Sequence, residues 1–102
     1  MRVFEVRISR SAYADMDNLR FFLDKMLSEK SAIEYANNMR AEIETLAVFA
    51  ECIGRTTSDT LRRIHPNARR MVSHNRKWNY VYHIDGDYVI VDRILPAKMN
   101  KG

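Results

Sequence analysis

The sequence predicts an α+β protein in which a helical hairpin packs on one face of a mostly antiparallel sheet. Three observations lead to this prediction. Residues 2–8 alternate apolar and charged side chains, residues 11–50 carry two apolar stripes at helical spacing, and residues 78–95 hold two runs rich in aromatic and β-branched side chains. The predicted order is an N-terminal strand, the helical hairpin and a three-stranded antiparallel meander.

The length of 102 residues suits a single domain, residues 1–102, with one hydrophobic core. A content of 46% hydrophobic and 29% charged residues is typical of a folded soluble protein. No stretch resembles the apolar run of a signal peptide or a membrane span, so we expect a cytoplasmic protein without membrane contact. Cys52 is the only cysteine, which excludes an internal disulfide.

The first half of the chain justifies one strand and two helices. Residues 2–8 form the half-buried strand. The first helix begins after Ser9 or Ser11, either of which can cap it, and runs to about residue 27. Ser31 and Glu34 have the spacing of a capping box, which predicts that the second helix begins there, and a glycine at position 54 closes it. The short link predicts an antiparallel pair.

The last two strands are predicted to form a β-hairpin over residues 78–84 and 88–95. Between them, Asp85-Gly86-Asp87 supplies the backbone angles of a tight turn. A two-residue loop then determines which side chains share a face. The core face is predicted to carry Trp78, Tyr80, Tyr82, Ile84, Val89, Val91 and Leu95. The opposite face is predicted to carry Asn79, Val81, His83, Tyr88, Ile90, Asp92 and Ile94.

A cationic block, residues 55–77, separates the helices from the hairpin. It holds seven Lys or Arg residues against Asp59 alone, a net charge of +6. Residues 55–68 lack periodicity, whereas residues 69–73 predict a further strand. Such a block suggests an anionic partner, either nucleic acid or an acidic protein segment. The alternative is a solvated basic loop.

Three segments carry a resemblance to a known family. They are R-I-S-R-S-A-Y-A-D-M-D over residues 7–17, A-x-E-Y-A over residues 32–36, and the ending Y-x-I-D-G-D-Y-V-I-V-D-R-I-L-P-A-K-M-N over residues 82–100. Together with the element order, they make the chain resemble the RelE/ParE superfamily of bacterial type II toxins. The resemblance implies a chromosomal or plasmid-borne toxin that inhibits growth, needs no cofactor and forms a hetero-oligomer with a cognate antitoxin.

The superfamily divides into RelE-like ribosome-dependent nucleases and ParE-like poisons of DNA gyrase. Nucleases of this kind carry an arginine at the position that resembles Asn79 of this chain, and a cation at the position that resembles Lys98 or Met99. They often also carry a C-terminal tyrosine, whereas no tyrosine follows Tyr88 here. The ending over residues 94–100 is more similar to the ParE-like branch. The resemblance therefore implies noncatalytic poisoning of DNA gyrase, with a metal-independent endonuclease acting on ribosome-bound mRNA as the alternative.

Each reading has its own candidate residues. RNA cleavage through the 2′-hydroxyl needs a base, an acid and a fixed cation for the charge developing on the phosphate. The candidates for those roles are His83, Arg70, Lys77 and Lys98. Binding of a target or antitoxin needs only an exposed cationic surface, and its candidates are Arg69, Arg70, Arg76, Lys77, Arg93, Lys98 and Asn79. His65 and His74 have no nearby carboxylate or cysteine in the sequence, so no metal site is expected.

Overall fold

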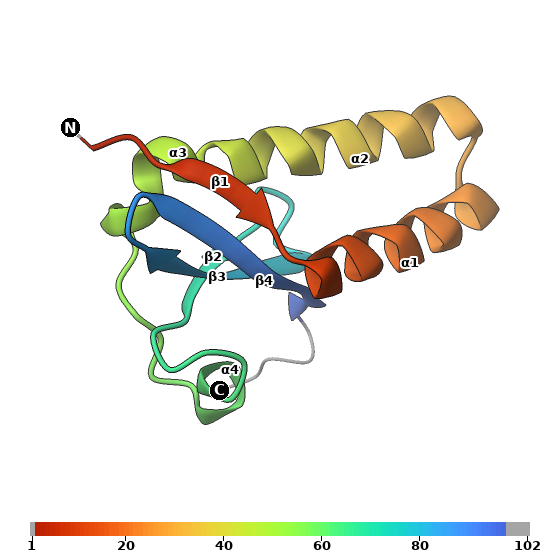
Figure 1. The fold of residues 1–102 in the computed structure, drawn as a ribbon. Coiled ribbons are helices and arrows are strands. Elements are labelled where there is room, and N and C mark those ends of the chain that lie inside the picture. The colour runs from red at the N-terminus through yellow and green to blue at the C-terminus, as the bar shows by residue number, and fades with distance from the viewer. Residues whose placement is uncertain (1, 98–102) are drawn as a thin grey trace.

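A four-stranded mixed sheet organises the molecule (Figure 1). The structure is a computed structural model that describes residues 2–97. The strands lie in the order β1-β4-β3-β2, with β1 parallel to β4 and the other neighbours antiparallel. In chain order the elements are β1 (Glu5–Ile8), α1 (Arg10–Met26), α2 (Glu29–Glu44), α3 (Leu46–Phe49), η1 (Ala50–Cys52), α4 (Asp59–Arg62), β2 (Arg69–Val72), β3 (Trp78–Asp85) and β4 (Tyr88–Pro96). The predicted α+β fold is confirmed. None of the helices described is long and apolar enough to cross a bilayer.

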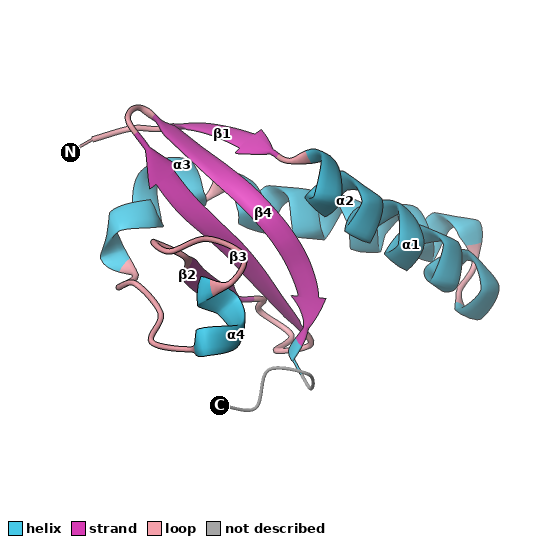
Figure 2. Ribbon diagram, turned by 60° about the horizontal axis from the view of Figure 1, so that its bottom comes forward, coloured by secondary structure: helices cyan, strands magenta, loops and turns pink. Residues whose placement is uncertain are grey.

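The helical hairpin α1–α2 covers one face of the sheet and projects past its edge (Figures 1 and 2). Ser9 caps α1 as predicted, because its hydroxyl accepts a hydrogen bond from the Ala12 amide at 3.1 Å. The predicted start of α2 at Ser31 is wrong. Ser28 is the N-cap and accepts from the Ser31 amide at 3.2 Å, so Ser31 lies within the first turn of the helix.

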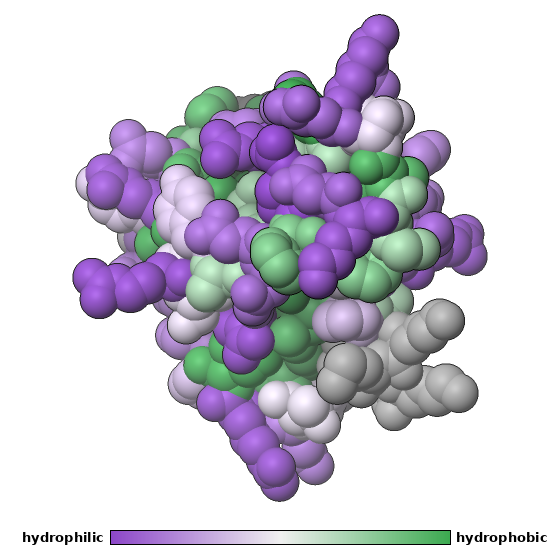
Figure 3. Space-filling view, turned by 90° about the vertical axis from the view of Figure 1, so that its right-hand side faces the viewer, coloured by the Kyte–Doolittle hydropathy of each residue, from purple (hydrophilic) through white to green (hydrophobic). Residues whose placement is uncertain are grey.

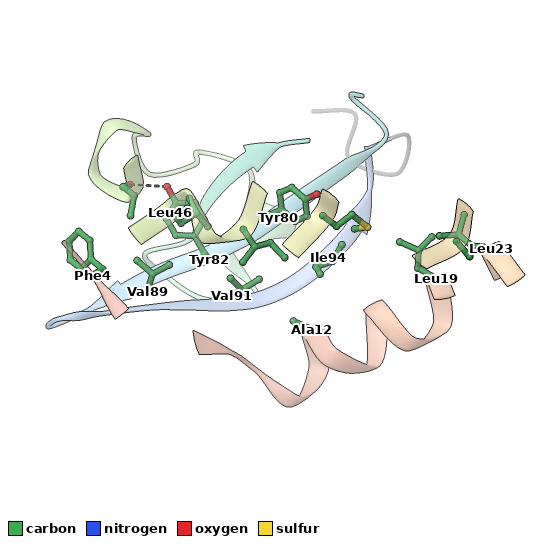
Figure 4. Packing of buried hydrophobic residues seen from close by; sticks show 14 residues of the cluster. Phe4, Ala12, Leu19, Leu23, Leu46, Tyr80, Tyr82, Val89, Val91 and Ile94 are labelled. Atoms are coloured by element: carbon green, nitrogen blue, oxygen red, sulfur yellow. Dashed lines mark hydrogen bonds between the residues drawn. The ribbon is translucent and has the colours of Figure 1, made fainter. Parts of the chain in front are cut away.

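The main hydrophobic core lies between the hairpin and the sheet (Figure 4). Phe4 next to β1 is 4% exposed, and Val6 and Ile8 also pack against this core, as the alternation predicts. Tyr82 on β3 is completely buried, and its hydroxyl donates to the Ala50 carbonyl at 2.8 Å. Because the polar end of Tyr82 has a partner, the ring can contribute its apolar area at no cost in unsatisfied groups.

A β-bulge changes which residues of β4 face the core. The pairing follows the prediction as far as Tyr82, which lies opposite Val91. The register then shifts, and Tyr80 lies opposite Ile94. Ile94 is consequently 4% exposed in the main core, while Leu95 packs on the other face. The predicted faces of Leu95 and Ile94 are therefore wrong, because the extra residue of a bulge inverts the alternation.

The segment that carries α4 crosses the sheet face opposite the hairpin (Figure 2). Leu61, Ala68 and Val81 form a second, smaller buried cluster there, with Ile64 and Leu95 packed against it. Ser58 caps α4, accepting from the Leu61 amide. Residues 55–68, which have no periodicity, are thus anchored by a few apolar contacts rather than by a long helix.

Candidate functional site

The sheet face opposite the hairpin carries two of the predicted functional residues, Arg70 and His83. Arg70 on β2 pairs with Val81 on β3, and His83 lies two positions further along the same strand. Because side chains alternate along a strand, Arg70, Val81 and His83 share this face. We refer to it as the α4 face. The mixed polar and apolar character predicted for it is confirmed for Val81 and His83, although the α4 segment covers part of it.

The His83 imidazole is held by two neighbours on the α4 face. Its Nδ1 lies 2.7 Å from Asp92 Oδ2, and both side chains are largely buried, with 14% and 16% exposed. An ionised carboxylate can only accept a hydrogen bond, so Nδ1 is the nitrogen that donates to Asp92. Nε2 is the ring nitrogen that takes no part in this bond. The His65 ring stacks on His83, with 3.7 Å between ring centroids and 3° between their planes. His65 Nδ1 in turn accepts from the Asn67 amide at 3.0 Å.

This histidine cluster of His65, His83 and Asp92 has part of what acid–base chemistry needs. A carboxylate that orients an imidazole is a common arrangement for a general base. A phosphate would also need a cation beside it. Over residues 2–97, no Lys or Arg side chain forms a hydrogen bond or ion pair with any of the three residues. Its described contacts join His65, which follows α4, to β3 and β4 of the sheet.

Arg93 is joined to α1. Its Nε and Nη2 donate to the two carboxylate oxygens of Asp15 at 2.8 and 3.0 Å, and Asp15 also accepts from the Ile94 amide at 2.9 Å. The hydrogen bond to Asp15 raises the pKa of Arg93, so it stays charged. The side chain of Asp15 is 14% exposed and that of Arg93 41%. Arg93 thus ties the last strand to the first helix.

Two further candidates are occupied within the fold, since Arg69 donates to main-chain carbonyls and Asn79 is buried. The Arg69 guanidinium donates to the Ile53 carbonyl at 2.6 Å and, at 3.5 Å, to the Ala50 carbonyl. These are main-chain acceptors at the end of the helical stretch, so Arg69 stabilises the chain where it leaves η1. Asn79 is 2% exposed between β2 and β4. Asn79 is therefore not exposed on the surface where it was predicted to contact a partner.

The remaining cationic candidates lie near the turn between β2 and β3. Arg76 and Lys77 are exposed, and Arg76 occupies the left-handed region with φ of 62°. Arg70 is partly exposed on β2. Lys98 lies outside the described residues. Arg70, Arg76 and Lys77, which we call the free cations, have no side-chain ion pair within residues 2–97.

An apolar groove of about 360 Å³ lies where α1 meets the ends of β3 and β4. Its lining residues are Asp15, Asn18, Leu19, Phe22, Trp78, Ile94 and Pro96. Along the outer part of the hairpin, Phe21, Phe22 and Met26 are 65%, 58% and 67% exposed. Figure 3 shows hydrophobic surface among hydrophilic side chains at this end of the molecule. This groove and the exposed side chains beside it are a candidate interaction surface.

Comparison with known proteins places the fold. No family model matches the sequence, and no curated protein matches it. Among solved structures, a chain of the "Chromosomal ParDE TA system from P. aeruginosa" is similar, with a TM-score of 0.77 and 15% sequence identity. The likeness covers 92% of this chain and 96% of that one. The two chains share one fold. The RelE/ParE-like fold predicted from the sequence is thereby confirmed.

Sequence reasoning missed His65 and Asp15. His65 was considered only as a possible metal ligand, because nothing in the order of residues indicates that its ring stacks on His83. Asp15 is an acidic residue of an ordinary amphipathic helix, and its bond to Arg93 depends on how α1 is placed against β4. In both cases the signal is in the tertiary arrangement, which no local pattern carries.

Proposed function

We propose that the chain is the toxin of a type II toxin–antitoxin pair, that it acts on DNA gyrase by binding rather than by catalysis, and that a cognate antitoxin neutralises it. The observation that carries the proposal is the shared fold with a chain of a ParDE toxin–antitoxin structure over nearly the whole length. The ending over residues 94–100, similar to the ParE-like branch, favours gyrase as the target. No cofactor or metal enters the proposal.

The positions of the candidate residues support a binding mode of action. His83 is engaged with Asp92 and covered by His65, and Arg93 is engaged with Asp15. The free cations extend from β2 into the neighbouring turn and remain available to an anionic surface. A toxin that works by binding needs such a surface on a rigid sheet, and it needs no proton transfer.

The apolar groove supports the antitoxin part of the proposal. It lies beside exposed aromatic residues of α1, and an amphipathic segment of an antitoxin would bury both together. Phe22 lines the groove while being 58% exposed, so Phe22→Ser should weaken antitoxin binding without unfolding the toxin. Copurification of the variant with the product of the adjacent gene tests this, and undiminished copurification would place the antitoxin elsewhere.

The gyrase assignment is tested with purified protein. The chain is expected to inhibit supercoiling by gyrase or to trap gyrase on cleaved plasmid DNA, and induced cells should activate the DNA damage response. Exposed charge contacts contribute about 0.5 to 1 kcal/mol each, so removing the three free cations should weaken the effect about tenfold or more. The variant is R70Q/R76N/K77Q, in which asparagine is chosen because it tolerates the positive φ at position 76.

A matched control separates local charge from net charge. The variant R10Q/K30Q/R40Q removes three exposed cations from the two long helices and changes the net charge equally. It should retain the potency of the unmodified chain. Equal losses in both triple variants would mean that the free cations form no specific surface, and an unmodified chain without effect on gyrase would refute the target.

The alternative function is cleavage of ribosome-bound mRNA, and the pairing of His83 with Asp92 on the same face as Arg70 is the observation that favours it. Under the gyrase proposal, His83→Ala leaves toxicity nearly unchanged provided the protein folds. Loss of toxicity in a folded H83A variant, together with codon-specific cuts in mRNA, would establish the nuclease instead.

A further inference from the structure

A second pocket, of about 310 Å³, opens between α2 and the turn that joins β2 to β3. We call it the α2 pocket. On the helix side it is lined by Tyr35, Asn38, Met39 and Glu42, whose spacing places them on one face of α2, and on the turn side by His74 and Asn75. Its volume lies at the lower end of the range of ligand sites. The proposed function makes no use of it.

The Tyr35 hydroxyl in this pocket has a proton to donate. It accepts from the Trp78 indole nitrogen at 2.7 Å and from Asn75 Nδ2 at 2.9 Å. The orientation of the Asn75 amide is settled by its other end, because Oδ1 accepts from the Lys77 main-chain amide at 3.0 Å. An indole N–H and an amide NH₂ only donate, so both lone pairs of the hydroxyl are used. Its O–H has no acceptor among residues 2–97.

Glu42 supplies a carboxylate without a cation. Its Oε2 accepts from the His74 amide at 2.6 Å and its Oε1 accepts from the Tyr80 hydroxyl at 3.3 Å. Burial, followed by the charge of Glu42, raises the pKa of Tyr80, so Tyr80 remains a neutral donor. A carboxylate has about four acceptor positions, which leaves one open on each oxygen. In the described part of the chain no Lys or Arg pairs with Glu42.

We propose that the α2 pocket binds the side chain of an arginine presented by a partner protein. The guanidinium donates to both oxygens of Glu42, and a main-chain carbonyl of the partner beside that arginine accepts from the Tyr35 hydroxyl. A planar guanidinium fits two open acceptors in one plane, which a lysine ammonium does not. Glu42 is partly buried, and a carboxylate that has lost part of its hydration gains most from a charged partner.

The probe for this proposal is N-acetyl-L-arginine methylamide, added to the full chain labelled with ¹⁵N. We expect the amide signals of His74 and Asn75 and the indole signal of Trp78 to shift together, with millimolar affinity suited to a single side chain. The matched control compound is the citrulline analogue, which has the same shape without the charge. It should bind at least fivefold more weakly, and the lysine analogue should also bind more weakly.

Two variants with the same change in charge complete the test. Glu42→Gln removes the proposed acceptor, whereas Glu44→Gln alters an exposed residue two positions away that does not line the pocket. E42Q should lower the affinity for the arginine probe at least fivefold, and E44Q should leave it unchanged. Equal binding of the citrulline or lysine analogue, an unaffected E42Q variant, or the absence of shifts at these signals would each overturn the proposal. The comparison of probes on the unmodified chain requires no variant to fold and no gyrase or antitoxin, so it stands apart from the proposed function.

Discussion

Replacing Asp15 by alanine should destabilise the protein more than replacing its partner Arg93. The Asp15 carboxylate accepts three hydrogen bonds, two from the Arg93 guanidinium and one from the Ile94 amide. It bonds α1 to the last strand. Asp15→Ala removes these three hydrogen bonds and with them a connection between the helical hairpin and the sheet.

The two substitutions differ in what they leave behind. The Arg93 side chain is 41% exposed and can regain water when Asp15 is removed, so the ion pair itself is worth about 1 kcal/mol or less. The Ile94 amide belongs to a residue that is 4% exposed, and a buried donor without an acceptor costs about 1 to 3 kcal/mol. We therefore expect Asp15→Ala to cost about 2 to 4 kcal/mol and Arg93→Gln about 1 kcal/mol.

Urea unfolding followed by the fluorescence of Trp78, the only tryptophan, measures both values. A loss of 2 to 4 kcal/mol is a large part of the 5 to 15 kcal/mol by which a domain is usually stable, so D15A should unfold at clearly lower urea. Asp15→Asn should fall between the two variants, because its amide oxygen can still accept from the Ile94 amide. If D15A and R93Q were equally destabilised, the main-chain bond would contribute nothing and the reasoning would be refuted.

Two further predictions concern Tyr82 and His65. Burial raises the pKa of Tyr82 to about 12, above the value of 10.0 for a free tyrosine. The unfolded chain therefore loses this proton first, and the free energy of unfolding should fall as the pH rises from 10 to 12. Tyr82→Phe should make that fall shallower in urea titrations at alkaline pH, and an identical slope would contradict the assignment. His65→Ala should loosen the α4 segment and speed tryptic cleavage after Arg62 and Arg63, as measured by mass spectrometry, whereas His74→Ala in the distant turn should leave the cleavage rate unchanged.

The strands and the two long helices of this fold could be predicted because each has a local signal, whereas the short helices α3, η1 and α4 could not. The stripe that includes Leu19 and Leu23 repeats at helical spacing, and both residues are buried in α1. Gly86 was predicted to lie in the hairpin turn, and its φ of 59° is one that glycine adopts without strain. Periodicity and turn chemistry act over a few residues, so they can be recognised before any tertiary contact is known.

The bulge between β3 and β4 shows where this local reasoning ends. Strict alternation assigns Leu95 to the core, and a single extra residue reverses the assignment for everything that follows. Ile94 and Leu95 are both large and apolar, so the composition of the strand does not distinguish the two registers. The choice is made by what each face packs against, with Ile94 under the helical hairpin and Leu95 beside the α4 segment.

The charge of the sequence was a poor guide to what individual residues do. A count treats every cation in residues 55–77 as available, yet Arg69 is used to satisfy main-chain carbonyls at the end of η1, and Arg93 outside that block is used to bond α1. Arginine suits both uses because its several donors fit carbonyls and carboxylates as well as phosphates. The acidic residues also differ from one another, since Asp15 accepts three hydrogen bonds, two of them from Arg93, whereas no Lys or Arg of residues 2–97 pairs with Glu42. Candidates for contact with a partner are therefore better sought among the charges that have no ion pair within residues 2–97, such as Arg76, Lys77 and Glu42, than in the net charge.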